Sequence, residues 1–105
     1  MRKAKVSVHS TPAGILIETK PNQTYEFEYL EGYQAAPVSL TMPVEGKQFS
    51  YNHFPPFFEG LLPEGIMLDG LLRQLKIDAN DYFAQLMATG RDLIGAVTVE
   101  QISDE

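Results

Sequence analysis

The chain of 105 residues contains neither cysteine nor tryptophan, and it has only two histidines, His9 and His53. The absence of cysteine excludes disulfide bonds and thiolate chemistry, and it fits a reducing cytoplasm. Two histidines without cysteine do not complete a tetrahedral zinc site unless carboxylates help, and no helical His-x-x-x-His spacing is present. We therefore expect no metal site and no cofactor, and we interpret both histidines as ordinary surface residues.

Positive charge and long apolar runs are also scarce. Eight lysines and arginines face fourteen acidic residues, which gives a net charge of -6. Such a chain repels a nucleic-acid backbone on average, so we expect no direct binding to nucleic acid. No apolar stretch is long enough to cross a membrane, and the first ten residues alternate like a strand rather than a signal peptide. We expect no membrane association and a cytoplasmic location.

Strand patterns fill the first half of the chain. Residues 4–9 and 13–20 predict an antiparallel hairpin that turns around residues 10–14. Residues 24–30 alternate strictly, with aromatic side chains on one face and glutamates on the other, which is typical of a half-buried strand. The aromatic positions are Tyr25, Phe27 and Tyr29, and the acidic ones are Glu26 and Glu28. Residues 37–42 predict a further short strand, and residues 43–56 predict a loop.

Helical patterns dominate the second half. A helix of about ten residues follows the Leu-Pro-Glu-Gly break, with leucines at helical spacing that predict one buried stripe. These are Leu68, Leu71, Leu72 and Leu75. Asp78 is expected to cap a second helix, with Asp81 three residues on and Gly90 as a left-handed terminal residue. Residues 95–102 predict a last strand. We expect residues 1–105 to form one α+β domain, an antiparallel β-meander with two α-helices and a C-terminal strand.

Groups for catalysis are few. No serine lies in a G-x-S-x-G elbow, and the glycines at 60 and 65 have P-loop spacing without the Lys-Ser/Thr that a Walker A motif requires. The acidic residues Glu59, Glu64 and Asp69 are explained by the positive end of a helix dipole. We therefore expect the chain not to be an enzyme.

The sequence "FFEGLLPEGIMLDGLL", residues 57–72, is the least ordinary segment. On a helix that begins at Glu64, Ile66 points away from the leucine stripe and Met67 lies to one side of it. Two interpretations remain open. In the first, these side chains are not surplus to the core, because the helix begins later or because the Phe57–Phe58 segment covers them. In the second, they form an exposed apolar tip of the kind that partner sites use.

The segments "PVSLTMP", "PPFFEGLLPEG" and "DANDYFAQLMATGRDLIGAVTV" resemble, in this order, the N-terminal subdomain of the HipA family of serine/threonine kinase toxins. The resemblance covers about residues 24–102 and implies a small α+β module. The kinase's nucleotide-binding loop, catalytic aspartate and metal-binding aspartate have no counterpart. A free-standing subdomain of this kind is similar to HipS of tripartite HipBST toxin–antitoxin systems. There HipT is the separate kinase and HipB the DNA-binding helix-turn-helix protein.

The resemblance implies an antitoxin that binds and inhibits a HipT-like serine/threonine kinase, with a HipB-like protein as a further partner in a ternary complex. The Leu-Pro-Glu-Gly-Ile-Met tip would face the kinase cleft, and without tryptophan only Ile66 or Met67 could act as a wedge. The implied partner-binding residues are Phe57, Phe58, Leu62, Pro63, Glu64, Gly65, Ile66 and Met67. The alternative is a non-inhibitory structural half of a split HipA-like kinase, which would scaffold the kinase and a HipB-like protein.

Overall fold

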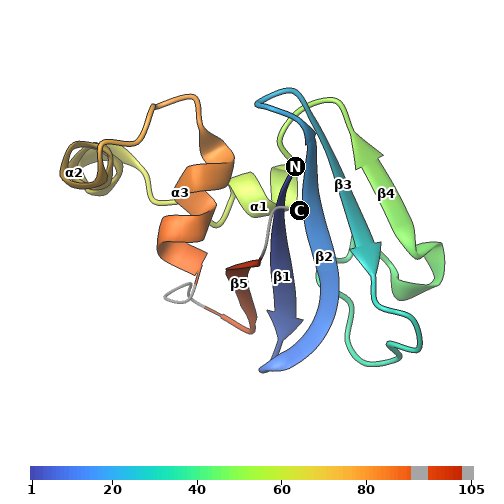
Figure 1. The fold of residues 1–105 in the computed structure, drawn as a ribbon. Coiled ribbons are helices and arrows are strands. Elements are labelled where there is room, and N and C mark those ends of the chain that lie inside the picture. Colours follow the sequence, from blue (N-terminus) through green and yellow to red (C-terminus); the bar gives the residue numbers. More distant parts are fainter. Residues whose placement is uncertain (91–94, 103–105) are drawn as a thin grey trace.

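A computed structural model describes residues 1–90 and 95–102 and has the expected α+β architecture. In this part of the chain, five strands form one antiparallel sheet in the order β4-β3-β2-β1-β5, with the helices on one face (Figure 1). The strands are β1 (Arg2–Val8), β2 (Thr11–Lys20), β3 (Thr24–Tyr29), β4 (Gln48–Tyr51) and β5 (Val97–Ile102). The helices are α1 (Pro56–Glu59), α2 (Gly65–Leu75) and α3 (Tyr82–Thr89), with a 3-10 turn η1 at Val44–Gly46.

The first hairpin turns earlier than the sequence pattern predicts. His9 and Ser10 form the connection, and both have positive φ angles, 49° and 65°. Such turns match the twist of the flanking strands, so a two-residue connection suffices. Thr11 and Pro12 already pair with β1, so the expected turn at residues 10–14 is wrong. His9 is therefore a residue of the hairpin turn.

The alternation predicted for the third strand is confirmed. Tyr25, Phe27 and Tyr29 are buried on the face that the helices cover, whereas Glu28 is exposed to solvent. The rings of Phe27 and Tyr29 also pack edge-to-face, with their centroids 4.9 Å apart. A period of two thus determines which face of β3 enters the core.

The expectations for residues 37–56 are partly wrong. Residues 37–42 form no strand but a tight turn with one isolated bridge between Ser39 and Met42. The buried Tyr29 hydroxyl holds this turn, because it accepts a hydrogen bond from the Val38 N–H at 2.9 Å and donates one to the Met42 carbonyl. A side-chain anchor of this kind leaves no periodic signal in a sequence.

The predicted loop at residues 43–56 contains η1 and the edge strand β4. In β4, Phe49 lies opposite Phe27 and Tyr51 opposite Tyr25. The strand has only four residues, and its alternation is too short to stand out beside the prolines that follow.

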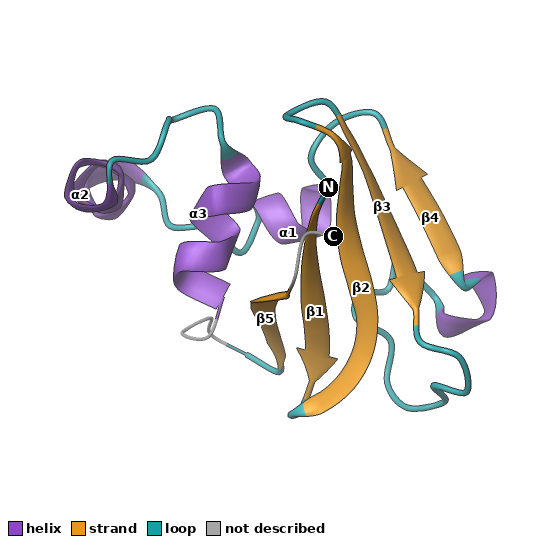
Figure 2. Ribbon diagram, viewed as in Figure 1, coloured by secondary structure: helices purple, strands orange, loops and turns teal. Residues whose placement is uncertain are grey.

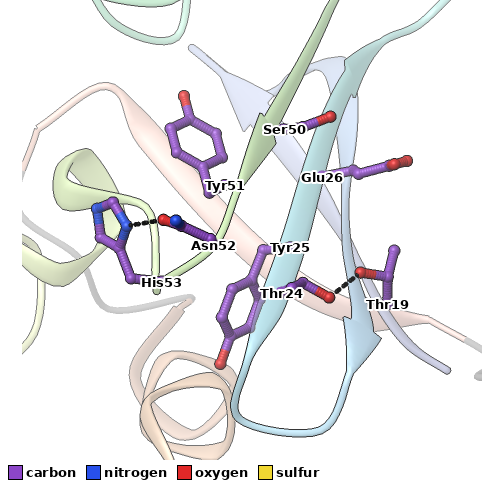
Figure 3. Close-up of a pocket in the computed structure, with 8 residues that line it drawn as sticks. All are labelled: Thr19, Thr24, Tyr25, Glu26, Ser50, Tyr51, Asn52 and His53. Carbon is purple, nitrogen blue, oxygen red and sulfur yellow. Dashed lines mark hydrogen bonds between the residues drawn. The ribbon is translucent and has the colours of Figure 1, made fainter.

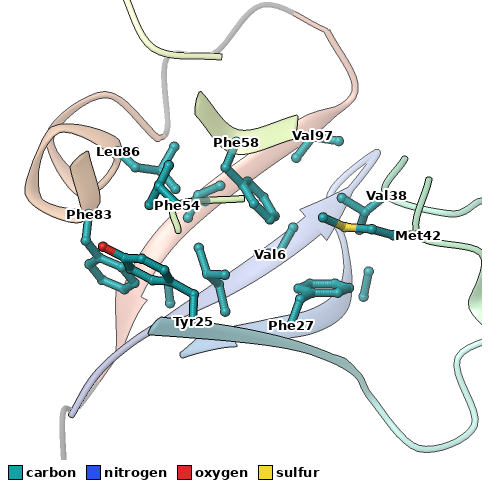
Figure 4. Packing of buried hydrophobic residues seen from close by; sticks show 14 of the residues in the cluster. Val6, Tyr25, Phe27, Val38, Met42, Phe54, Phe58, Phe83, Leu86 and Val97 are labelled. Carbon is teal, nitrogen blue, oxygen red and sulfur yellow. The ribbon is translucent and has the colours of Figure 1, made fainter. Parts of the chain in front are cut away.

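The core lies between the sheet and the helices. Figure 4 shows Phe58 of α1 and Phe83 and Leu86 of α3 packed over Val6 and Phe27 of the sheet. The single-turn α1 was not expected from the sequence. Its first residue is a proline, whose fixed φ suits the start of a helix.

The boundaries of α3 differ from the prediction. Asp81, not Asp78, caps the helix, and its side chain accepts a hydrogen bond from the Ala84 N–H at 3.1 Å. The Asp78 carboxylate instead accepts one from the Asn80 N–H within the preceding turn. Gly90 ends the helix in a right-handed conformation, so the expected left-handed cap is wrong. A side chain there would collide with the Val99 carbonyl, so the glycine allows close packing on β5.

Arg2 connects α3 to the sheet. Its guanidinium donates two hydrogen bonds of 2.7 Å to Glu18 on β2 and two, of 2.9 and 3.2 Å, to the capping residue Asp81. It also lies over the Phe83 ring, 5.0 Å from the centroid. Because Glu18 is only 3% exposed, its carboxylate depends on this partner for compensation. We call these three charged residues the Arg2 clamp.

The clamp changes the ionisation of its members. Hydrogen bonds from Arg2 to Glu18 are the main reason why the pKa of the Arg2 guanidinium lies above its ordinary value. Burial alone would raise the pKa of Asp81. The hydrogen bonds from Arg2 and from the Ala84 N–H, together with the charge of Arg2, outweigh burial and hold that pKa below its ordinary value.

Replacing the arginine tests the clamp. Arg2→Ala is expected to lower the free energy of unfolding by about 3 kcal/mol, because the buried Glu18 carboxylate loses its cationic partner and keeps the neutral Asn22 N–H donor at 3.1 Å. Urea denaturation at pH 7 measures this loss. The control is Lys5→Ala, which removes an exposed pair at 4.0 Å from Glu100 and should cost less than about 1 kcal/mol. Equal losses in the two variants would contradict the role of the clamp.

The clamp also predicts a dependence on acid. Because the pKa of Asp81 is lower in the folded than in the unfolded chain, its stabilising contribution is complete above the unfolded value of about 3.9. The contribution is lost as the pH falls through the folded value. Urea denaturation between pH 7 and pH 2 should therefore show a shallower acid loss for Asp81→Asn than for the wild type. Parallel curves would show that Asp81 titrates alike in both states.

Candidate partner-binding surface

Four consecutive residues form an exposed corner where the chain enters α2. We call Glu64, Gly65, Ile66 and Met67 the α2 tip; all four are exposed. Ile66 is 88% and Met67 76% exposed, which decides between the two interpretations of the sequence in favour of the exposed one. Gly65 has a φ of +59°, which an L-residue adopts only with strain, so the glycine lets the chain turn directly into the helix.

The leucine stripe behind the tip is less buried than predicted. Leu68, Leu71 and Leu72 are only half-buried and Leu75 is 48% exposed, so the expectation of one buried stripe is wrong. The physical reason is the position of α2. The helix lies on the far side of α3 from the sheet, as Figure 2 shows, and none of its eleven residues, all of them described, is buried.

The other predicted site residues form the base of the tip. Phe58 and Leu62 are buried in the core, whereas Phe57 and Pro63 are half-buried. Backbone hydrogen bonds of 3.1 Å from Leu61 to Phe58 and from Leu62 to Glu59 fix the segment between α1 and α2. The structure therefore separates the eight residues into an anchored base and an exposed tip.

The loop at the other end of α2 is also fixed. The amide of Gln85 in α3, 1% exposed, donates hydrogen bonds to the carbonyls of Asp78 and Ala79 at 3.3 and 3.1 Å. The last turn of α2 ends at Lys76, which is left-handed, and the Ile77 N–H bonds to the Leu72 carbonyl. Both connections thus hold α2 in place although its own residues remain outside the core.

Charge surrounds the tip unevenly. The exposed carboxylates of Glu59 and Glu64 precede α2 and that of Asp69 lies in its second turn, whereas Arg73 and Lys76 come at its C-terminal end. This order suits the dipole of the helix. It also surrounds two exposed apolar side chains with negative charge, and that combination favours a partner surface that is apolar with a basic rim.

A hollow of ≈ 500 Å³ lies at the β3–β4 end of the sheet, where Figure 3 shows its lining residues. Its histidine, His53, is hydrogen-bonded to the amide of Asn52 at 2.8 Å rather than to a carboxylate or a hydroxyl. Burial raises the pKa of Tyr25 to about 12, so this hydroxyl stays protonated at neutral pH and is no base. The lining residues do not show a nucleophile held by a base, as covalent catalysis requires.

The described ranges 1–90 and 95–102 offer neither a cluster of metal ligands nor a membrane-spanning helix. These residues contain no group of three or more histidine and acidic side chains placed to hold a metal ion. Their helices are also too short and too polar to cross a membrane.

Leu40 is the most exposed large apolar residue outside α2 among the described residues, and no sequence pattern indicated its exposure. Leu40 is 95% exposed at the end of the turn that Tyr29 anchors. The alternation of Leu40 with its polar neighbours predicted a strand at residues 37–42. Its exposure follows from the turn that these residues form instead. A single exposed leucine is ordinary on a protein surface, and it provides a control position for experiments on the tip.

Stability measurements test the division between base and tip. Ile66→Ala and Met67→Ala should each change the free energy of unfolding by less than about 0.5 kcal/mol, because both side chains are solvent-exposed. Leu62→Ala should cost about 3 kcal/mol, because it opens a cavity at the edge of the core. Urea denaturation measures all three. A loss at Ile66 as large as that at Leu62 would show that the tip packs against the domain.

Comparison with known proteins identifies the family. The profile of the HipA N-terminal domain family matches residues 4–100. An uncharacterized protein of Haemophilus influenzae is 31% identical over 101 residues, which are 96% of this chain and 93% of that protein. A serine/threonine-protein kinase toxin HipA of Shewanella oneidensis is 34% identical over 76 residues, which are 70% of this chain but only 17% of the toxin.

The fold agrees with these matches. A solved structure described as the N-terminal domain of HipA toxin superposes with a TM-score of 0.77 at 28% identity, and the match covers 100% of this chain and 96% of that chain. The Phe-Phe-x-x-Leu-Leu-Pro-Glu-Gly motif forms α1 and the entry to α2. Residues 91–94 of the Gly-Arg-Asp motif lie outside the described residues. A profile match over nearly the whole chain and a relative of almost equal length show that this chain belongs to the HipA N-terminal domain family.

Proposed function

We propose that this chain is an antitoxin-type regulator that binds a separate HipT-like serine/threonine kinase and inhibits it. The α2 tip faces the kinase cleft, and Ile66 or Met67 enters it. The chain acts without catalysis, metal or cofactor of its own, in the cytoplasm, and a HipB-like helix-turn-helix protein joins the complex. The observation that carries this proposal is the exposure of two large apolar side chains on a helix that the domain's own core does not use.

The relatives support a kinase as the partner. The matched residues make up 17% of the Shewanella kinase toxin, so that protein joins the same kind of domain to a much longer chain. The domain in the toxin and the present chain share the family and 34% of aligned residues. A surface that contacts kinase residues within one chain can make the same contacts between two chains.

The chemistry of the tip supports the cleft as the docking site. A kinase cleft holds a nucleoside triphosphate, whose phosphates are bound by basic side chains and metal ions. The apolar pair Ile66 and Met67, with Glu64 and Asp69 beside it, complements an apolar cleft with a basic rim. Methionine suits such a site because its unbranched side chain adapts to irregular pockets. Occupation of the cleft excludes nucleotide or keeps the two lobes apart.

Phosphorylation by a HipT-like kinase from the same genome tests the proposal. Wild-type protein should suppress the phosphorylation, and the double variant Ile66→Asp, Met67→Asp should bind about 30-fold more weakly, because hot-spot residues of an interface contribute about 2 kcal/mol or more. The new carboxylates lie at the N-terminal end of α2, where the helix dipole favours them, so the variant should fold.

The matched control is Leu40→Asp, which makes the same chemical change at an exposed leucine away from α2. It should inhibit like the wild type. Equal loss of inhibition in both variants would contradict the tip as the binding element. Binding with undiminished kinase activity would instead favour the structural half that scaffolds the kinase and a HipB-like protein, and absence of binding would reject both functions.

A further inference from the structure

Gly70 occupies an unusual place in the middle of α2. Glycine is the weakest helix former apart from proline, because its backbone loses the most freedom on folding. The residue is exposed, is the central residue of the helix, and is flanked in sequence by Asp69 and Leu71. A glycine at an interior helical position calls for a packing or functional reason.

The domain itself supplies no packing reason. No described atom lies within 4 Å of the position that a Cβ would take at Gly70. Gly90, by contrast, is required because a Cβ would collide with the Val99 carbonyl. Gly70 has no positive φ either, unlike Gly65, so alanine fits its backbone conformation. Among the described residues, no contact compensates for the helix stability that the glycine costs α2.

The position of Gly70 on the helix points outward. Residues three and four apart are neighbours on a helix surface, so Gly70 lies beside both Met67 and Ile66. These are the two most exposed apolar side chains of α2, at 76% and 88%. The missing side chain therefore leaves a notch next to an apolar pair, where another backbone can come close to α2.

We propose that Gly70 is the point where the backbone of α2 comes closest to the kinase. An apolar segment of the kinase packs there into the notch formed by Ile66, Met67 and Gly70. This inference rests on the proposed function, because the kinase is the occupant. Charge complementarity favours a kinase cleft over a second copy of this chain. The notch lies beside Glu64 and Asp69 in a chain of net charge -6, so a second copy would bring like charges together.

Two substitutions test the notch. Gly70→Ala should raise the melting temperature by about 4 °C, because alanine is the better helix former and meets no atom. The same variant should bind the HipT-like kinase about tenfold more weakly, because the added methyl group overpacks the contact. Gly70→Leu should weaken binding further. A variant that is more stable yet binds less cannot owe its defect to misfolding.

The control is Ala88→Leu, which places a leucine at an exposed position of α3 and should leave affinity unchanged. Affinity is measured by calorimetry with the purified kinase. Wild-type affinity in both Gly70 variants would overturn the notch while leaving the proposed function intact, and a lower melting temperature for Gly70→Ala would show an internal need for glycine and overturn it also. If the wild type does not bind the kinase, the proposed function fails and the notch fails with it.

Discussion

The Arg2 clamp is the constraint on which the rest of the structure depends. One guanidinium joins the start of β1, the buried Glu18 of β2 and the residue that caps α3. The clamp therefore fixes the distance and angle of α3 over the sheet, and the ring of Phe83 beneath the guanidinium completes the contact. Loss of Arg2 would leave the buried Glu18 carboxylate without a cationic partner, so the anchor of α3 is specific as well as stabilising.

Because α3 packs against the sheet, α2 lies outside the core. Its two connections are fixed, at one end by the segment between α1 and α2 and at the other by Gln85, yet none of its residues is buried. The result is an anchored base that carries a half-exposed helix with an apolar tip. Preorganisation of this kind lowers the entropy that is lost when a partner binds. An exposed apolar helix on a small, otherwise well-packed domain is what a protein–protein docking element requires.

The sequence predicted elements with a sustained period better than elements fixed by single contacts. The alternation in β3 and the span of α2 follow from periods of 2.0 and 3.6 residues, and both are confirmed. The turn at Ser39–Met42 and the cap at Asp81 depend on the hydroxyl of Tyr29 and the guanidinium of Arg2, which are distant in sequence. For the candidate surface, helical spacing predicted that Ile66 points away from the leucines and that Met67 lies to one side of them. It did not show that the leucines themselves stay half-exposed, because that depends on where α2 lies relative to α3.

The proposed function requires α2 to be the element that contacts a kinase partner. Hydrogen exchange measured by mass spectrometry, on the domain alone and in complex with a HipT-like kinase, tests it directly. We predict that binding slows exchange in residues 64–75 and leaves β1, β2 and β3 unchanged, because the partner covers the tip without altering the sheet. Slower exchange confined to the β4 edge, with α2 unchanged, would contradict the claim.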